Sequence, residues 1–326
     1  MSDVKVVFIH GVNQRVLQAI TSRNPEGFVT TPIEAKSMPE EKQIEAVKDA
    51  DFVLWFSAKM SDRVLRSAKK ARLVQGLSAG YDSVNLKLLR ELNIPCANNG
   101  GANSWAVADH AVLDMLTLYR RLAAADRSTR DGKWRAAIDG TNTFEMAGKV
   151  VGIMGFGNIG QKVARRVQAF DAVVHYYDIF PQTPARDREL NAKQVSREEL
   201  FRTSDIITLH APLTNDTRHV VNRARLATMK PSAILINTSR GEVVDETALY
   251  EALRDKRIAG AGLDVFEQEP VDPANPLLKL DNVVVSPHTA GTTWDTWFRR
   301  AEFAYANMKR VWAGQPPQAV ATDYDM

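Results

Sequence analysis

One stretch, residues 149–160, constrains the fold more than any other part of the chain. It begins with the apolar run K-V-V-G-I-M, which predicts a short buried strand, and continues through G-F-G-N-I-G into a segment with helical spacing. In such a strand–turn–helix unit, Gly155 permits a tight turn, Gly157 lets the backbone approach a pyrophosphate, and Gly160 lets the helix pack closely on the strand. The N–H groups and the dipole at the start of the helix favour a phosphate group.

A glycine-rich turn can also be purely structural, so the residues that follow it matter. A second strand is predicted over 172–177, and it ends at Asp178, 23 residues after Gly155. A carboxylate at about 20 residues from the turn is typical of dinucleotide sites, where it binds the ribose hydroxyls. The combination predicts a dinucleotide-binding site.

The totals exclude several classes of protein. A chain of 326 residues has room for two domains with cores of their own. The net charge of +3 and the lack of a dense basic run do not suggest nucleic-acid binding. Cys96 is the only cysteine, which rules out an internal disulfide and fits a reducing compartment. Because no apolar run approaches the length of a membrane span or a signal peptide, we expect a cytoplasmic protein without a membrane partner. No Cys/His cluster has metal-ligand spacing, so no metal site is expected.

Strands and helices alternate on both sides of the glycine turn. The predicted strands cover 4–9, 52–56, 72–77, 94–98, 149–154, 172–177, 205–209, 233–236, 258–263 and 282–286. The segment around Pro32 and Pro39 predicts a loop and then a helix, and long helices are expected over 105–125 and 294–312. This alternation is typical of parallel, doubly wound sheets. We predict an α/β fold with a Rossmann domain over 102–291, inserted into a flavodoxin-like domain made of 1–101 and 292–326.

Polar residues gather where the strands of the second domain end, which is where parallel sheets bind ligands. They are Asp178, His210, Thr238, Arg240, Asp264 and His288. Arg240 has a fork of donors suited to a carboxylate, and His288 can carry a proton near neutral pH. A carboxylate beside an imidazole raises the imidazole's pKa and orients the ring, and Glu269 is a candidate for that role. Taken one by one, these residues could equally be a surface arginine, a packed histidine and a surface acid.

The motifs occur in an order that points to one family. After G-F-G-N-I-G and Asp178 come L-H-A-P-L-T at 209–214, N-T-S-R-G at 237–241, L-D-V-F-E-Q-E-P at 263–270 and S-P-H-T-A-G at 286–291, while S-A-G-Y-D at 78–82 and V-A-D-H at 107–110 precede them. The set resembles the NAD-dependent D-2-hydroxyacid dehydrogenases, the superfamily of D-3-phosphoglycerate dehydrogenase, glyoxylate/hydroxypyruvate reductase and D-lactate dehydrogenase. Asp109 stands where this family usually has Glu.

The resemblance implies hydride transfer between NAD(H) and C2 of a small 2-oxo or D-2-hydroxy acid. Arg240 would bind and polarise the substrate, His288 would act as acid and base, and Glu269 would raise the pKa of His288. Ser78, Ala79 and Gly80 of the other, substrate-binding domain would join Arg240 and His288 in holding the substrate. The cofactor would be held by Val107, Gly155, Gly157, Asn158, Ile159, Gly160, Asp178, His210, Pro212, Thr217, Thr238, Ser239, Arg240, Asp264, His288 and Gly291. Domain closure and a homodimer are expected on the same ground.

Related activities on this fold are weighed by single residues. The formate dehydrogenases carry Gln where Glu269 stands, although Gln268 is adjacent, and the phosphite dehydrogenases carry Lys where Ala79 stands. Glu269 argues against formate once a one-residue misregister with Gln268 is excluded, and Ala79 argues against phosphite. An NAD-sensing, corepressor-like interaction protein stays open as an alternative, because such relatives can keep all three catalytic residues. His10, His175 and His219 are expected to be structural, and His110 to pack or to cap on the long helix. Trp55, Phe56 or Trp297 could pack in the core or line a substrate pocket.

Overall fold

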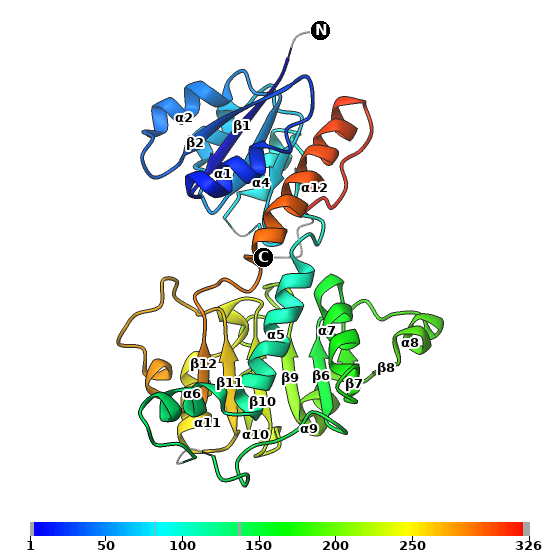
Figure 1. Cartoon of the computed structure of the whole chain (residues 1–326). Coiled ribbons are helices and arrows are strands. Elements are labelled where there is room, and N and C mark those ends of the chain that lie inside the picture. The colour runs from blue at the N-terminus through cyan, green and yellow to red at the C-terminus, as the bar shows by residue number, and fades with distance from the viewer. Residues whose placement is uncertain (1–2, 82, 136–137, 322–326) are drawn as a thin grey trace. The chain divides into compact units, whose positions relative to one another are not determined.

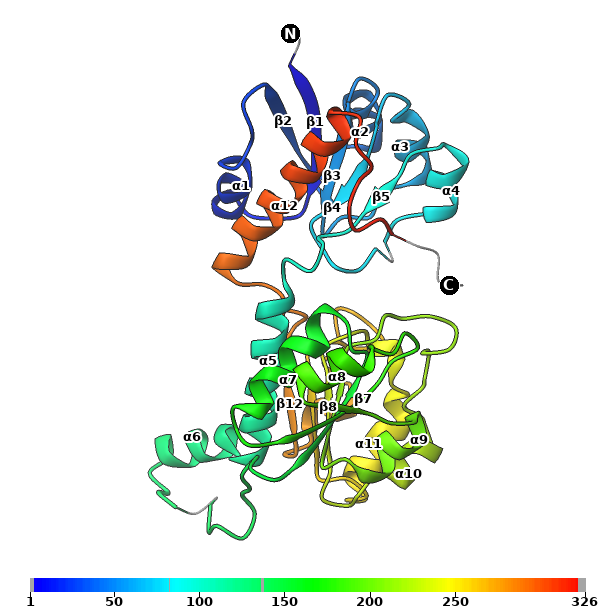
Figure 2. The same cartoon turned by 90° about the vertical axis from the view of Figure 1, so that its right-hand side faces the viewer.

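The computed structural model describes residues 3–81, 83–135 and 138–321 and divides into two compact units (Figures 1 and 2). Unit 1 contains the described residues up to Asn103 and those from Thr292 onward, and unit 2 is Ser104–Gly291. Asp82, the last residue of the S-A-G-Y-D motif, lies outside the described residues. The two units are treated separately below.

Unit 1 is built on a five-stranded sheet with the order β2-β1-β3-β4-β5, in which all pairs of strands are parallel. Its strands are β1 (Val4–His10), β2 (Phe28–Glu34), β3 (Phe52–Phe56), β4 (Val74–Gly76) and β5 (Cys96–Ala97). Its helices are α1 (Gln14–Thr21), α2 (Glu40–Val47), α3 (Asp62–Ser67), α4 (Leu86–Glu91) and α12 (Trp294–Trp312). This strand order is that of the flavodoxin-like doubly wound fold.

The sequence predicts a loop around Pro32, but in the structure this segment is the strand β2. Pro32 lies inside the strand and pairs with Phe8 of β1. A proline cannot donate to the ladder, which normally removes it from a sheet. Here β2 is an edge strand and pairs only with β1, so no second neighbour needs the missing N–H group.

Alternate residues of the strands pack on opposite faces of the unit 1 sheet. Val7 and Ile9 belong to one buried cluster, while Val6 and Phe8 belong to another that includes Trp297 of α12. Trp55 is fully buried, and a Cβ at Gly76 would lie only 2.6 Å from its ring. Trp55 is therefore a core residue. Phe56 and Trp297 pack edge to face with ring centres 4.9 Å apart.

Unit 2 is built on a seven-stranded parallel sheet with the order β12-β11-β10-β9-β6-β7-β8. Its strands are β6 (Val150–Met154), β7 (Val173–Tyr177), β8 (Ala192–Gln194), β9 (Ile206–Leu209), β10 (Ile234–Asn237), β11 (Gly260–Leu263) and β12 (Val283–Val285). Its α-helices are α5 (Ser104–Tyr119), α6 (Leu122–Arg130), α7 (Asn158–Gln168), α8 (Pro184–Leu190), α9 (Arg197–Thr203), α10 (Arg223–Thr228) and α11 (Glu246–Arg254), with 3-10 turns at Gly241–Val243 and Pro276–Lys279. The order reverses between β6 and β9, as in a Rossmann domain, so the predicted fold class is confirmed.

The long helix predicted over 105–125 is two helices, α5 and α6. The break falls at Arg121, whose φ of 50° lies in the left-handed region and cannot continue a right-handed helix. The apolar pattern continues across this break, which is why the sequence alone suggests one helix.

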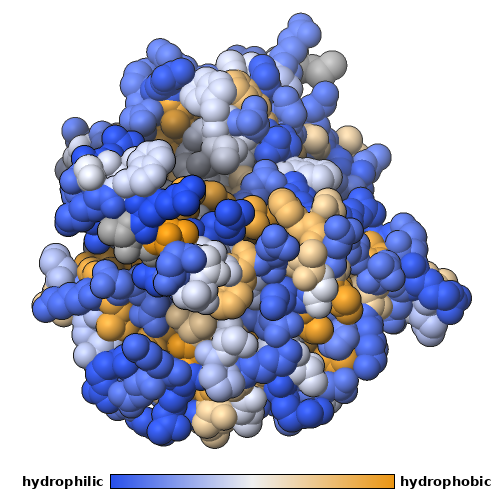
Figure 3. Space-filling model, turned by 60° about the horizontal axis from the view of Figure 1, so that its bottom comes forward, coloured by the Kyte–Doolittle hydropathy of each residue, from blue (hydrophilic) through white to orange (hydrophobic). Residues whose placement is uncertain are grey.

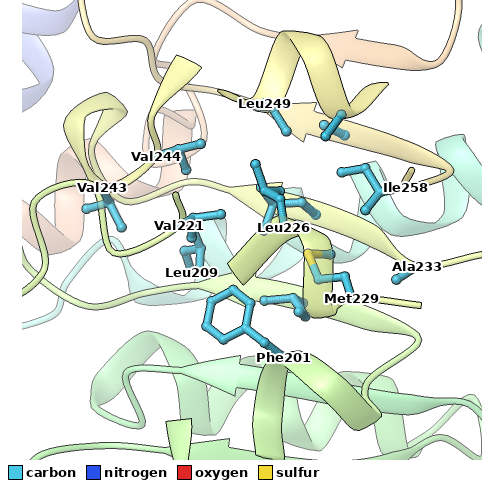
Figure 4. Close-up of a cluster of buried hydrophobic side chains, with 14 of the residues drawn as sticks. Phe201, Leu209, Val221, Leu226, Met229, Ala233, Val243, Val244, Leu249 and Ile258 are labelled. Carbon is cyan, nitrogen blue, oxygen red and sulfur yellow. The ribbon is translucent and has the colours of Figure 1, made fainter. Parts of the chain in front are cut away.

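The helix α5 lies directly on strands β10 and β11 (Figure 1). A Cβ at Gly262 of β11 would lie 2.8 Å from the Cβ of Asp114, and one at Gly260 would lie 3.2 Å from Leu118. The small residues of β11 therefore let this helix approach the sheet. On one face of the sheet, side chains of α9, α10, α11 and the strands converge in a second buried cluster, as Phe201, Leu226 and Leu249 show in Figure 4.

The surface shown in Figure 3 is mostly hydrophilic, with hydrophobic side chains scattered among the charged ones. Several large apolar side chains of unit 2 are exposed, including Leu113 and Leu122 of α5 and α6. Among the helices of the described residues, none is both long and apolar enough to cross a membrane.

Candidate active site

The glycine turn after β6 is shaped by contacts that exclude a side chain. Gly155 has a φ of 91°, and a Cβ there would lie 2.5 Å from the backbone nitrogen of Ala211. A Cβ at Gly160 would lie 2.3 Å from the carbonyl oxygen of Gly155. The start of α7 therefore packs against the turn as closely as the motif predicts.

The first turn of α7 fits a phosphate group. Its N-cap is Gly157, which offers no side-chain acceptor, and no acidic residue lies in the first turn. By contrast, Asn222 and Asp245 cap α10 and α11 with their side chains. A Cβ at Gly157 would meet nothing within 4 Å, so the space in front of this helix end is open. The backbone N–H groups at Asn158, Ile159 and Gly160 could thus bind the pyrophosphate of a dinucleotide.

Asp178 lies beside this turn at the end of β7. Its Oδ2 accepts a hydrogen bond from the backbone N–H of Phe156 at 2.5 Å, and its Oδ1 accepts one from Phe180 at 2.8 Å. These bonds fix the carboxylate next to the glycine turn, the position in which it could accept hydrogen bonds from a ribose.

His210 follows β9, and its backbone lies against Gly155 of the glycine turn. Its Nε2 lies 2.8 Å from Thr208 Oγ1, and its Nδ1 lies 3.4 Å from Thr238 Oγ1. Burial lowers the pKa of His210 to about 3, so the ring is neutral at physiological pH. Thr217 stabilises the loop that follows His210, because its hydroxyl donates a hydrogen bond to the carbonyl of Pro212 at 2.7 Å.

Arg240 lies in the loop after β10, and a buried residue holds that loop. Asn237 donates from Nδ2 to the carbonyl of Arg240 at 2.9 Å, and its Oδ1 accepts from the N–H and hydroxyl of Ser239 at 3.1 and 2.8 Å. The guanidinium of Arg240 donates to the carbonyl of Ser239 at 2.7 Å. The sequence shows Asn237 in its motif but assigns it no role. An Asn as the last residue of a buried strand is the signal that could have identified it.

The loop of Arg240 lies against the loop of Glu269. A Cβ at Gly241 would lie 1.9 Å from the backbone carbon of Phe266, so the two backbones are in direct contact. Glu269 in turn accepts a hydrogen bond from the N–H of Phe266 at 3.1 Å. Only glycine permits this approach of the two loops.

Glu269 and His288 form the closest pair of the predicted catalytic residues. His288 Nδ1 lies 2.6 Å from Glu269 Oε2, and the imidazole is about half exposed. Burial by itself raises the pKa of Glu269, but the hydrogen bond and charge of His288, the Phe266 N–H and the charge of Arg240 outweigh it and lower this pKa. Glu269 is therefore ionised at neutral pH. The structure brings Arg240, Glu269 and His288 together in unit 2.

The other predicted site residues are distributed over both units. Val107 is buried on α5, Gly291 is the last residue of unit 2, and Asp264 is buried after β11. Ser78, Ala79 and Gly80 follow β4 in unit 1, and their relation to the site of unit 2 stays a prediction. Within the ranges that the structure describes, no group of three or more His, Cys, Asp or Glu could hold a metal ion.

A backbone N–H group and a part-buried amide side chain hold the turn at Ser78 and Ala79. The carbonyl of Ser78 accepts from the N–H of Asn99 at 3.0 Å, and that of Ala79 accepts from Asn98 Nδ2 at 3.1 Å. Gln75 donates to the carbonyl of Asn98 at 2.7 Å and accepts from Asn307 of α12 at 2.8 Å. The sequence does not single out these amides, because their partners are far apart in the chain.

Comparison with known proteins agrees with this geometry. The model of the D-isomer specific 2-hydroxyacid dehydrogenase NAD binding domain matches residues 112–290. The chain belongs to the D-isomer specific 2-hydroxyacid dehydrogenase family. It is an NAD-dependent dehydrogenase, and unit 2 contains its NAD-binding domain.

Its relatives include several glyoxylate reductases. The chain is 41% identical to that of Korarchaeum cryptofilum over 281 residues, which cover 85% of this chain and 84% of the relative. It is 37% identical to that of Pyrococcus furiosus over 290 residues, which cover 87% and 86%. The crystal structure of the TT0316 protein from Thermus thermophilus is similar over 98% of this chain and 100% of that one, with a TM-score of 0.83 and 32% identity.

Proposed function

We propose that this dehydrogenase reduces small 2-oxo acids of the glyoxylate class to 2-hydroxy acids, with His288 as the proton donor. The observation that carries the proposal is the 2.6 Å contact between His288 and the ionised Glu269, beside the loop of Arg240. A charged carboxylate next to an imidazole stabilises its protonated form, which is the form that a proton donor needs.

Each residue then has one task in the reaction. NADH supplies the hydride that reduces C2 when it is bound in unit 2. Arg240 binds the substrate carboxylate with its fork of donors and polarises the carbonyl group. Because Nδ1 of His288 faces Glu269, Nε2 gives its proton to the oxygen on C2, which becomes the hydroxyl group. In the reverse direction, neutral His288 takes that proton back.

The choice of small 2-oxo acids rests on the relatives. Glyoxylate reductases match over more than four fifths of this chain, which supports glyoxylate and 2-oxo acids of similar size as substrates. The same family and the exposed apolar side chains of α5 and α6 support a homodimer.

The test is a steady-state screen of glyoxylate, hydroxypyruvate, pyruvate and branched 2-oxo acids with NADH, run on the wild type and on His288→Ala. We expect turnover of at least one small 2-oxo acid and a loss of about 10²-fold or more in the variant, with NADH binding nearly unchanged. Turnover that survives in His288→Ala would remove this residue from the mechanism. No turnover of any 2-oxo acid by the wild type would favour an NAD-sensing interaction protein instead.

A further inference from the structure

A second polar cluster lies behind the loop that carries His288. It consists of His110 and Asp114 on α5, Asp264 after β11, and Ser286 after β12. Asp114 and Asp264 are 4% and 2% exposed, so both carboxyl groups are buried. The proposed reaction uses neither His110 nor Asp114. Their position on α5, on the side that faces Ser286 and Asp264, therefore requires another explanation.

Asp264 anchors this loop. Its Oδ1 accepts from the hydroxyl of Ser286 at 2.5 Å and from the N–H of Thr289 at 2.8 Å, and its Oδ2 accepts from the N–H of Ala290 at 2.9 Å. Its backbone carbonyl accepts from the N–H of His288 at 2.7 Å. The loop is thus bound to one buried residue at four points.

The backbone of His288 needs such support. Its φ of 53° lies in the left-handed region, which is unfavourable for a residue with a side chain. Residues keep such a conformation only where their surroundings hold it, and this happens most often at functional sites. The position of the imidazole therefore depends on the bonds around Asp264.

The direction of the hydrogen bonds extends this support to α5. The hydroxyl of Ser286 has a single proton, and it donates that proton to Oδ1 of Asp264. The contact of 2.9 Å between Ser286 Oγ and His110 Nε2 must then use the proton of His110. A chain of donors runs from His110 through Ser286 to Asp264.

Asp114 completes the cluster next to His110. Its Oδ2 lies 3.7 Å from His110 Nε2 and forms no hydrogen bond with the described residues. Burial, with a contribution from the charge of Asp264, raises the pKa of Asp114 to about 7. The protonated form of Asp114 avoids a second negative charge beside Asp264. The missing side chain of Gly262 is what lets Asp114 reach this position.

We propose that His110 is a positioning residue that fixes, through Ser286 and Asp264, the loop that presents His288 to the substrate. The inference rests on the proposed role of His288 as proton donor. Removal of the His110 N–H leaves Ser286 with one partner fewer and loosens the loop. Proton transfer then slows, while the glycine turn and Asp178 keep binding NADH.

The test compares His110→Phe, which keeps the ring volume without the N–H, with His110→Gln, which keeps a donor. The control is His175→Phe on β7, in the same unit but outside the cluster. We expect His110→Phe to lower kcat by about ten- to a hundredfold, with an NADH Kd close to that of the wild type. The solvent deuterium isotope effect on kcat should rise, because proton transfer limits the rate more strongly. His110→Gln should restore most of both, and the control should resemble the wild type.

Hydrogen exchange gives a readout that does not depend on activity. The amides of Thr289 and Ala290 should lose protection in His110→Phe and regain it in His110→Gln. Wild-type kinetics and exchange in His110→Phe would overturn the inference, as would a general loss of stability that His110→Gln does not rescue. If His110→Phe does not fold, Ser286→Ala removes the middle of the same chain and should show the same changes. Retained turnover in His288→Ala would refute the proposed function alone, since exchange would still show whether His110 holds the loop.

Discussion

At the scale of single residues, the site depends on which carboxylate meets which imidazole. Glu267 and Glu269 lie two residues apart in one loop, yet Glu267 contacts His219 at 2.9 Å while Glu269 contacts His288 at 2.6 Å. In the second pair, the charge of Arg240 helps to lower the pKa of Glu269. The loop thus contains two glutamate–histidine pairs with different partners, and variants of the two glutamates can be compared directly.

Glu269→Gln should shift the pH dependence of the reaction to lower pH. The lowered pKa of Glu269 means that the wild-type site holds a negative charge throughout the neutral range. This charge lies beside Nδ1 of His288, the proton donor of the proposed reduction, at 2.6 Å. With the neutral amide, the negative charge that stabilises a proton on a neighbouring group is gone, so reduction should fall off at lower pH than in the wild type, and oxidation should begin at lower pH. The measurement is kcat/KM against pH in both directions.

Glu267→Gln is the control for this experiment, because it removes the same charge from the same loop. We expect its two pH profiles to match those of the wild type, since its partner His219 has no role in the proposed reaction. Equal shifts in both variants would mean that the general charge of the loop, and not the contact with His288, sets the pH dependence.

At the scale of elements, two glycines of the glycine turn are expected to have different tasks: Gly157 in cofactor binding and Gly160 in the packing of α7. Gly157→Ala should keep the melting temperature close to the wild type, because its Cβ meets nothing within 4 Å, but it should raise the NADH Kd about tenfold or more. Gly160→Ala should lower the melting temperature by more than about 5 °C, because its Cβ would lie 2.3 Å from a backbone oxygen. Thermal unfolding without cofactor and NADH titration separate the two effects. A stable Gly157→Ala with unchanged NADH affinity would place the pyrophosphate elsewhere.

The regular elements follow from local signals, and the exceptions follow from tertiary contacts. The strands β3 and β6 match the predicted apolar runs. The strand β2 is missed because a proline such as Pro32 normally indicates that a segment is not a strand. Only the structure shows that β2 lies at the edge of its sheet, where a proline is tolerated. The end of α5 is missed because the left-handed backbone of Arg121 leaves no mark in an apolar pattern.

The candidate site shows the same division. Arg240, Glu269 and His288 are recognised by their residue types and their motifs, but the residues that hold them are not. Asn237 acts on the backbone of Arg240, and Ser286 lies 176 positions from His110. The second contact forms only when the fold brings distant segments together, so spacing along the chain carries no signal for it. Asn237 acts over three residues, and its place at the end of a buried strand is the signal that the sequence does offer.

At the scale of the whole molecule, each unit has cores of its own. One buried cluster of unit 1 combines its first strands with α12 from the end of the chain, and the clusters of unit 2 draw on residues between Ala108 and Leu277. The chain therefore passes between the units twice, and unit 2 is continuous in sequence.

The exposed apolar residues of α5 and α6 predict how two copies associate. Leu113 and Leu122 are 52% and 55% exposed, although both lie in helices next to a well-packed core. Covering large exposed apolar side chains with a partner protein lowers the free energy, so such side chains often mark an interaction surface. We expect a dimer in solution, and the double variant Leu113→Glu/Leu122→Glu should be monomeric by light scattering after size exclusion. Val173→Glu, at a β7 position that is 49% exposed, is the control and should stay dimeric. A monomeric wild type, or a double variant that still dimerises, would show that these two helices do not form the contact.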